Sequence, residues 1–298
     1  MSGKLCNQCP RRCGIDRDVS RGFCGTGNKI KIARAALHQW EEPCISGTRG
    51  SGAVFFCGCN LKCVFCQNSE ISRGGGGKEV SSERLGKIFV ELKNSGAHNI
   101  NLVTPTHYAR QIRTAIESVR SDISIPFVYN CGGYESIDGL SHLSDYISVY
   151  LTDIKYFSDE HELARRYSRC NDYFERAVAA LDFMIKTVGV PKYDKDGIMQ
   201  SGVIVRHLVL PSHRHDSICL LNYLKENFGT EGFRLSLMSQ FTPNGGLADY
   251  PELNRRITTF EYNSVTDTAY DLGFRDAYVQ QRSSANTEYT PPFDLTGV

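Results

Sequence analysis

Cysteine is the residue type in this sequence best able to do chemistry, because its thiolate binds metal ions and iron–sulfur clusters. The chain has 12 cysteines in 298 residues, and nine of them lie before residue 67. Core cysteines would be spread along the chain, and disulfides would be typical of a small secreted domain with an export signal. Reduced thiols at short spacings indicate metal or iron–sulfur ligation instead.

Three of these cysteines follow a predicted strand in VFFCGCNLKCVFCQN, where Cys59, Cys63 and Cys66 are spaced as C-x3-C-x2-C. In parallel α/β proteins the loops after the strands carry the chemistry. Three thiolates on one loop can bind three irons of a [4Fe–4S] cluster and leave the fourth iron open to a substrate or cofactor. A zinc site with a fourth ligand from elsewhere, or a purely structural role, is the less favoured alternative.

A second cysteine pattern lies at the N-terminus, where Cys6, Cys9, Cys13 and Cys24 form C-x2-C-x3-C-x10-C. Glycines follow the last two of them and let the backbone turn tightly around a metal. Four thiolates close a tetrahedral site, which fits a structural zinc ion. An auxiliary [4Fe–4S] cluster fits the same ligand count, and free thiols are the third alternative.

The rest of the chain predicts the scaffold that positions these residues. From residue 53 to about 240, short β-rich runs alternate with amphipathic helical patterns, which implies βαβ units and a parallel sheet. We expect strands at 53–57, 98–104, 125–130, 146–154, 202–210 and 233–238, and helices at 82–96, 107–120, 171–189, 217–229 and 263–274. Six β/α units of this length favour a partial (β/α)6 barrel over a closed eight-stranded one.

The predicted domain organisation has three parts. Residues 1–48 form a four-cysteine metal module and a connector, which continues as a mixed segment to residue 52. Residues 49–250 form the partial barrel, and residues 251–298 form a C-terminal helix and an extended tail rich in Ser and Pro.

Composition and charge exclude several classes of protein. With 41% hydrophobic and 22% charged residues the chain is expected to fold. A formal net charge of +1 gives no reason to expect a nucleic acid partner. The sequence has no apolar run of membrane-span length, and its start lacks the apolar core of a signal peptide. We therefore expect a cytoplasmic protein with no membrane partner.

The C-x3-C-x2-C motif, with the aromatic Phe65 before its last cysteine, resembles the signature of the radical S-adenosylmethionine (SAM) superfamily. The flanking text GSGAVFFCGCNLKCVFCQN, preceded by ARAALHQWEEPCISG, resembles the pyruvate formate-lyase activating enzyme-like branch. More narrowly, it resembles activase-like proteins with an N-terminal four-cysteine extension. The resemblance covers most of the chain, including the closing PPFD.

This resemblance implies a cofactor, a reaction and partners. SAM would chelate the open iron through its amino and carboxylate groups. An electron from the reduced cluster would cleave it to methionine and a 5′-deoxyadenosyl radical that abstracts hydrogen. An electron donor such as flavodoxin or ferredoxin and a protein or peptide substrate are the implied partners. Phe65 would lie near the cofactor.

The resemblance extends to charged residues at two strand ends. Asp153 and Lys155 match the D-x-K of activases, with a surface ion pair as the alternative. Arg206 lies where related enzymes place a basic residue near the SAM carboxylate. His207 follows it and should face the other way by strand alternation.

The sequence departs from the superfamily at two other strand ends. The Gly-Gly-Glu stretch that usually binds the SAM amino group is replaced by LVTPTH, which makes Thr104, Thr106 and His107 the candidates. Helix capping is the alternative role for Thr106. Asn130 stands where activases often have Asp, so it is the candidate at the third strand.

Three substrate classes stay open for a radical SAM enzyme, since fold and cofactor do not choose among them. They are a glycyl-radical protein, another protein or peptide, and a small metabolite. A protein of a different class, a non-catalytic iron–sulfur electron carrier or sensor, would have no SAM site. In that case Asp153 and Arg206 would be incidental.

Metal analysis tests the four-cysteine site. If this site is closed and structural, aerobically purified protein is expected to contain about one zinc per chain. Replacing Cys6 and Cys9 by serine should then destabilise the fold more than it affects SAM binding. Iron in place of zinc, with a second paramagnetic signal after reduction, would contradict the zinc assignment and identify an auxiliary cluster.

Overall fold

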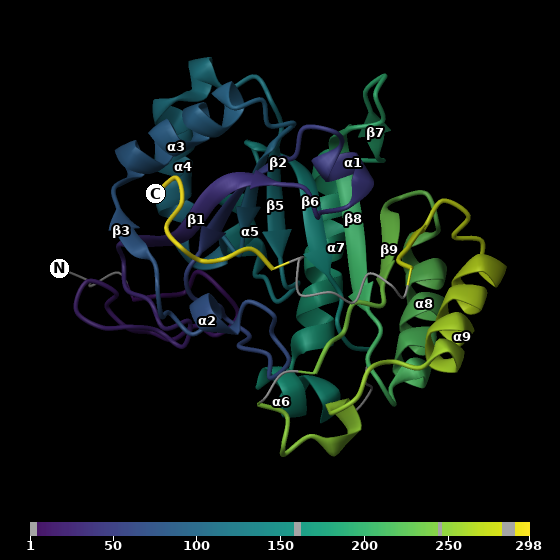
Figure 1. The fold of residues 1–298 in the computed structure, drawn as a ribbon. Helices are drawn as coiled ribbons and strands as arrows, with labels where there is room; N and C mark the ends of the chain where they lie inside the picture. The colour runs from purple at the N-terminus through teal and green to yellow at the C-terminus, as the bar shows by residue number, and fades with distance from the viewer. Residues whose placement is uncertain (1–4, 158–161, 244–245, 282–289) are drawn as a thin grey trace.

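The centre of the fold is a parallel sheet of six strands in the order β9-β8-β6-β5-β4-β2 (Figure 1). In this computed structural model, residues 5–157, 162–243, 246–281 and 290–298 are described. The strands confirm the six that the sequence predicts, with bounds that differ by a few residues. They are β2 (Ser51–Phe56), β4 (Ile100–Val103), β5 (Phe127–Cys131), β6 (Ile147–Asp153), β8 (Met199–Leu208) and β9 (Arg234–Met238).

Further strands extend the sheet at both edges. β10 (Tyr278–Val279) pairs in parallel with β9, whereas β1 (Ile30–His38) and β3 (Lys78–Val80) extend the other edge in antiparallel pairing. The short β7 (Lys192–Tyr193) pairs with β8 off the main path. Because the strand order runs from β10 to β3 without closing, the described residues form a partial barrel of the expected α/β class.

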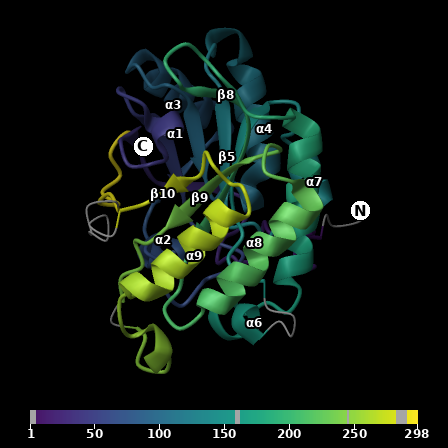
Figure 2. The same cartoon turned by 90° about the vertical axis from the view of Figure 1, so that its right-hand side faces the viewer.

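Helices connect the parallel strands and pack on the outer side of the sheet. In α3, the apolar residues Leu85, Ile88, Phe89 and Leu92 recur at helical spacing and are buried. Helices α8 and α9 lie side by side (Figure 2). The helices are α1 (Pro43–Ser46), α2 (Ser69–Ser72), α3 (Ser82–Asn94), α4 (Ala109–Ser118), α5 (Ile137–Ser141), α6 (Glu162–Ser168), α7 (Tyr173–Val188), α8 (Arg214–Phe228) and α9 (Thr259–Asp271). No described helix is long and apolar enough to cross a membrane.

The inner face of the sheet changes from apolar to polar along the strands. A small apolar cluster combines residues of α1, β5, β6 and β8, namely Cys44, Ile45, Val128, Val149, Leu151, Met199 and Ile204. Side chains two residues apart on a strand share a face. Asn130, Asp153 and Arg206 therefore follow Val128, Leu151 and Ile204 on the same face. The strands thus place a polar layer above an apolar one.

Residues 29–52, which the sequence predicts as a mixed connector, contain regular secondary structure. This segment contains β1, which pairs antiparallel with β2, and the short helix α1. The mixture of apolar and basic residues in IKIARAALH does not alternate strictly, and the pairing is irregular between Ile32 and Arg34. The proposed boundary at residue 48 therefore falls between two strands of one sheet.

The C-terminal part begins with α9, which overlaps the helix predicted at 263–274 and starts with a capping box between Thr258 and Glu261. Residues 282–289 of the predicted tail lie outside the described residues. The last segment, 290–298, runs along β1 (Figure 1), where Leu295 N donates to Ala33 O at 3.0 Å and Ala35 N donates to Thr296 O at 2.8 Å.

The N-terminal cysteine segment is attached to the barrel through backbone contacts and a buried arginine. Cys59 N donates to the carbonyl oxygen of Cys24 at 3.3 Å, which joins the two cysteine motifs. Gly58 permits this approach, because a Cβ there would lie 2.8 Å from the same oxygen. The guanidinium of Arg17 donates to the carbonyl of His107 and, at 3.2 Å, to Thr26 Oγ1. Arg17 therefore holds the N-terminal segment against the barrel.

Replacing Arg17 by alanine is expected to lower the free energy of unfolding by about 3 kcal/mol, because buried carbonyl acceptors lose a charged donor. Denaturant unfolding under anaerobic conditions measures this change. Arg21→Ala is the matched control, since Arg21 is exposed in the same segment. Equal stability of the two variants would contradict the attachment role.

Candidate active site

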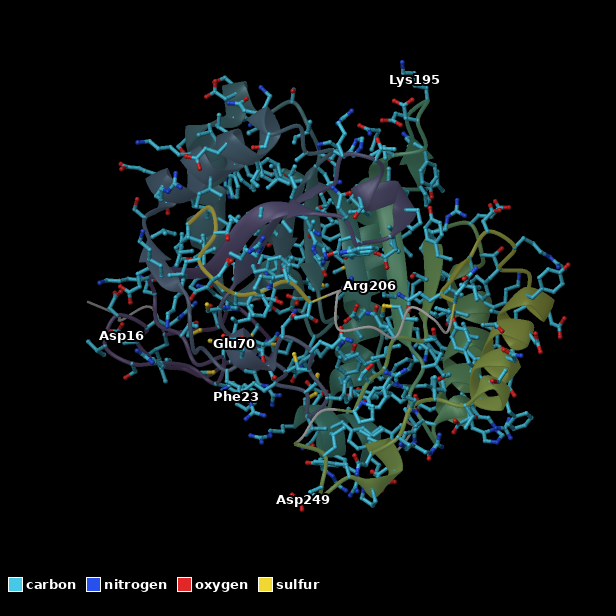
Figure 3. The ribbon with its side chains drawn as sticks, in the orientation of Figure 1. Asp16, Phe23, Glu70, Lys195, Arg206 and Asp249 are labelled. Carbon is cyan, nitrogen blue, oxygen red and sulfur yellow. The ribbon has the colours of Figure 1, made fainter. Side chains whose placement is uncertain are left out.

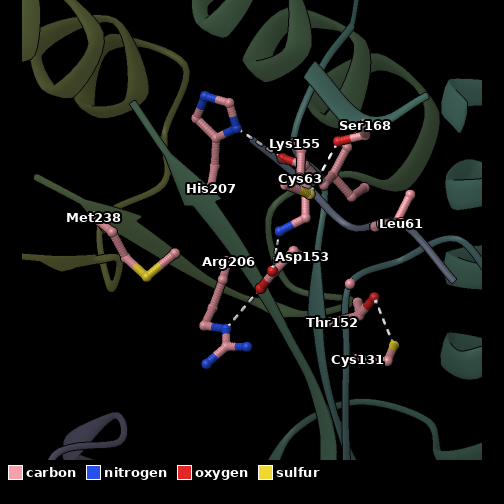
Figure 4. A network of polar contacts seen from close by, with 12 residues as sticks. Leu61, Cys63, Cys131, Thr152, Asp153, Lys155, Ser168, Arg206, His207 and Met238 are labelled. Carbon is pink, nitrogen blue, oxygen red and sulfur yellow. Dashed lines mark hydrogen bonds and ion pairs between the residues drawn. The ribbon is translucent and has the colours of Figure 1, made fainter. Parts of the chain in front are cut away.

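The cysteine loop follows β2 and faces a cavity of about 440 Å³ at the carboxyl ends of the parallel strands. Cys59, Cys63 and Cys66 all line this cavity. The buried Cys63 thiol lies 3.0 Å from Ser168 Oγ (Figure 4). Burial, together with the two neighbouring thiols, raises the pKa of Cys59 to about 12. The three sulfurs thus converge on one side of the cavity.

The donor set of this loop fits a [4Fe–4S] cluster. A cubane cluster takes one thiolate for each of three irons, and the three cysteines of this loop all line one cavity. Because ligation needs thiolates and burial favours the thiols, loading the site would release protons.

The N-terminal cysteines lie together only in part. The thiols of Cys13 and Cys24 each lie 3.5 Å from the place that a Cβ on Gly22 would take. Burial raises the pKa of Cys9 to about 12, and Cys13 and Cys24 add to the shift. These three thiols are therefore neighbours. Ligation by the four-cysteine set, including Cys6, stays a prediction, as does the identity of its metal.

Charged side chains from two strands meet on the other side of the cavity. Arg206 Nε donates to Asp153 Oδ1 at 2.9 Å, and Lys155 Nζ donates to Asp153 Oδ2 at 2.5 Å (Figure 4). Burial alone would raise the pKa of Asp153, but Arg206 and Lys155 outweigh it and hold this pKa below its ordinary value. Figure 3 shows Arg206 near the centre of the molecule. The D-x-K residues and Arg206 are therefore brought together, as the resemblance implies.

Sequence reasoning missed Glu41, which joins this network from the link between β1 and α1. Arg206 Nη1 donates to Glu41 Oε2 at 3.2 Å, and Asn130 Nδ2 and Asn101 Nδ2 each donate to Glu41 Oε1 at 3.1 Å. Arg206 Nη2 also donates to Asn130 Oδ1 at 2.7 Å. The acidic pair before Pro43 was the available signal, but the segment was interpreted as a connector.

The three residues predicted to bind the SAM amino group do not lie together in the structure. Thr104 lines the cavity with φ at +61°. Thr106 and His107 do not line it. Thr106 Oγ1 donates to the buried Glu135 at 2.7 Å, and His107 Nε2 lies 2.7 Å from the carbonyl oxygen of Cys57. Burial lowers the pKa of His107 to about 3, so the imidazole is neutral at physiological pH.

Two further residues lie away from the cavity. Phe65 is buried and packs edge-on against Phe241, with 6.0 Å between ring centroids, so it supports the loop from the core. His207 points to the opposite side of β8 from Arg206, as predicted (Figure 4). Its Nε2 lies 2.8 Å from Ser217 Oγ of α8.

The structure is thus a partial α/β barrel in which three cysteines and a charged network line one cavity. The family model of the radical SAM superfamily matches residues 53–199. Uncharacterized protein MJ0674 of Methanocaldococcus jannaschii is 30% identical over 278 residues, covering 89% of this chain and 74% of that protein. The chain belongs to the radical SAM superfamily. Membership implies an enzyme of radical chemistry that uses a [4Fe–4S] cluster, SAM and an electron donor.

Solved structures share the fold at low sequence identity. Streptococcus suis SuiB bound to the precursor peptide SuiA has a TM-score of 0.50 and 11% identity over 75% of this chain and 46% of that one. Methylornithine synthase (PylB) has a TM-score of 0.50 and 16% identity over 74% of this chain and 60% of that one. This chain therefore spans less than two thirds of either structure.

Arg206→Ala is expected to lower the free energy of unfolding by about 3 kcal/mol, because it removes the cation that contacts Glu41 and leaves Asp153 with Lys155 alone. In the variant the pKa of Asp153 and that of Glu41 rise, so protonation at low pH relieves the buried charge. The deficit should be largest above pH 7 and shrink as the pH falls toward 5.

Denaturant unfolding of wild type and variant at both pH values measures this deficit. Arg113→Ala, which removes an exposed ion pair with Glu117, serves as the control and should change stability little at either pH. A deficit of Arg206→Ala that does not depend on pH would show that lost packing, rather than charge, is its cause.

Proposed function

We propose that this protein cleaves SAM reductively and directs the resulting radical at a protein or peptide, in the manner of a glycyl-radical activase. The observation that carries the proposal is one cavity lined by both the cysteine triad and the charged residues of β6 and β8. When bound, the cluster of Cys59, Cys63 and Cys66 and its SAM would supply a 5′-deoxyadenosyl radical for hydrogen abstraction.

The charged network suits a ligand that carries a carboxylate. The guanidinium of Arg206 has five N–H groups and donates to Asp153, Glu41 and Asn130, so donors remain for a ligand. The ammonium group of Lys155 has three N–H donors and uses one of them in its ion pair with Asp153. Asp153 accepts on both oxygens from these cations, so we assign it to positioning them. Thr104 and Asn130 are the proposed polar contacts at the neighbouring strand ends.

The size of the substrate is the less constrained part of the proposal. SuiB, which shares the fold, is described as bound to a precursor peptide, and this favours a peptide or protein. The name of methylornithine synthase supports the alternative, a small metabolite. A non-catalytic electron carrier would have no use for the network of Asp153, Lys155 and Arg206.

SAM cleavage without substrate tests the proposed reaction. Anaerobically reconstituted and reduced protein is expected to release 5′-deoxyadenosine and methionine slowly, as measured by chromatography. Replacing Cys59, Cys63 and Cys66 together by alanine should abolish release and remove about four irons. Cys219→Ala is the matched control, because this exposed cysteine lies outside the cavity. A triple variant that keeps its full iron content would refute the ligand assignment.

Two further measurements address the substrate. Deuterium from a labelled candidate that enters 5′-deoxyadenosine would show that the abstracted hydrogen is carbon-bound. A glycyl-radical signal on a co-expressed partner would establish the activase function. If reduced protein neither binds nor cleaves SAM, the electron carrier becomes the better account.

A further inference from the structure

The cavity lining includes a buried carboxylate, Glu42, whose hydrogen bonds are incomplete among the described residues. Glu42 directly precedes α1 and is only 8% exposed. Its side chain has a hydrogen bond with Ser236 of β9, but Glu42 Oε2 has no hydrogen-bond partner among the described residues. An unpaired buried acceptor of this kind is rare in folded proteins, because it loses its water without compensation.

The charges around the cavity leave Glu42 in excess. Among the described residues, Arg206 and Lys155 are the cations that line the cavity, and both contact Asp153. Arg206 also contacts Glu41 and acts electrostatically on Glu42. Within the described part of the lining, three carboxylates therefore face two cations. His38 also lines the cavity, but burial lowers its pKa to about 4, so it is neutral at physiological pH and does not balance Glu42.

The position of Glu42 separates it from the cysteine loop. Glu42 contacts β9, whereas the cysteines follow β2, and β8, β6, β5 and β4 lie between these two strands in the sheet. Four strands thus separate the strand beside Glu42 from the strand that the cysteine loop follows. A ligand group held by Glu42 would therefore lie across the cavity from the thiols.

We propose that Glu42 binds a positively charged donor group of the substrate, an ammonium or a guanidinium, and so orients the substrate toward the cysteine loop. The ligand would give Glu42 Oε2 its missing donor and balance the third carboxylate. Burial raises the pKa of Glu42 to about 7, although the charge of Arg206 acts in the opposite direction. This inference rests on the proposed function, because it takes the cavity as the substrate site.

The test compares charged and neutral probes of equal size. Reconstituted protein with SAM but without reductant is titrated by calorimetry at pH 8 with two pairs of capped amino acids. One pair is acetyl-lysine amide and acetyl-6-hydroxynorleucine amide, and the other is acetyl-arginine amide and acetyl-citrulline amide. Wild type is expected to prefer a charged member at least tenfold, since a charged hydrogen bond is worth about that factor or more.

Glu42→Gln should remove this preference. Glu79→Gln is the matched control and should keep it, because Glu79 lies on β3 in an exposed pair with Lys29. If Glu42→Gln does not fold, the same titrations are carried out with Glu42→Asp. Its shorter side chain should shift the preference to a probe one methylene longer, such as acetyl-homolysine amide.

Several results would overturn the inference. The first is that the wild-type protein binds neither charged probe more tightly than its neutral partner. The second is that Glu42→Gln keeps the preference for the charged probe. The third is that Glu42→Asp does not shift its preference to the longer probe. A loss of SAM affinity in Glu42→Gln with unchanged probe preference would assign Glu42 to SAM and also overturn it. If SAM is cleaved without substrate but probes are not discriminated, only this inference fails. Absence of SAM cleavage is the failure of the proposed function itself.

Discussion

The buried ion-pair network around Arg206 is the constraint on which the rest of the site depends. Taking a guanidinium and two carboxylates out of water is costly, and only close pairing offsets the cost. Arg206 therefore fixes Asp153 of the adjacent strand β6 and Glu41 of the β1–α1 link in one arrangement. The link is drawn into the barrel as a result, and α1 closes the apolar layer beneath the cavity. One side chain thus connects the segment after β1 to the central strands β6 and β8.

The cysteine loop depends on a second set of contacts, which come from the N-terminal segment. Arg11, between two N-terminal cysteines, donates through Nε to Asn60 O at 2.9 Å and through Nη2 to Ser168 O at 3.1 Å. Ser168 Oγ in turn contacts the Cys63 thiol. Because Cys59 N also bonds to the Cys24 carbonyl, the N-terminal segment forms part of the wall that shapes the cluster loop. The two cysteine motifs are therefore one structural unit.

Periodicity predicted the six parallel strands because each is a short buried run, and spacing alone predicted the cysteine loop. Asp153, Lys155 and Arg206 could be predicted as site residues because they lie at strand ends, where parallel strands bring distant residues together. Thr106 and His107 were assigned to the cavity because they follow β4. However, the tight turn of Thr106–Tyr108 directs them to Glu135 and Cys57. Sequence order specifies which strand a residue follows, but not which way a turn points it.

Glu41 and Glu42 show most clearly what pattern reasoning could not separate. They are identical neighbours in a segment without clear periodicity, yet Glu41 contacts Arg206, Asn101 and Asn130, whereas Glu42 keeps one oxygen without a partner. The difference arises because the carboxylate of Glu41 accepts hydrogen bonds from strands that are distant in sequence, whereas the carboxylate of Glu42 lies beside Ser236 of β9. A fold optimised for stability alone would have replaced such a carboxylate with an apolar side chain. Local rules fail most often at functional sites, so a buried carboxylate that the fold leaves incomplete points to a ligand that completes it.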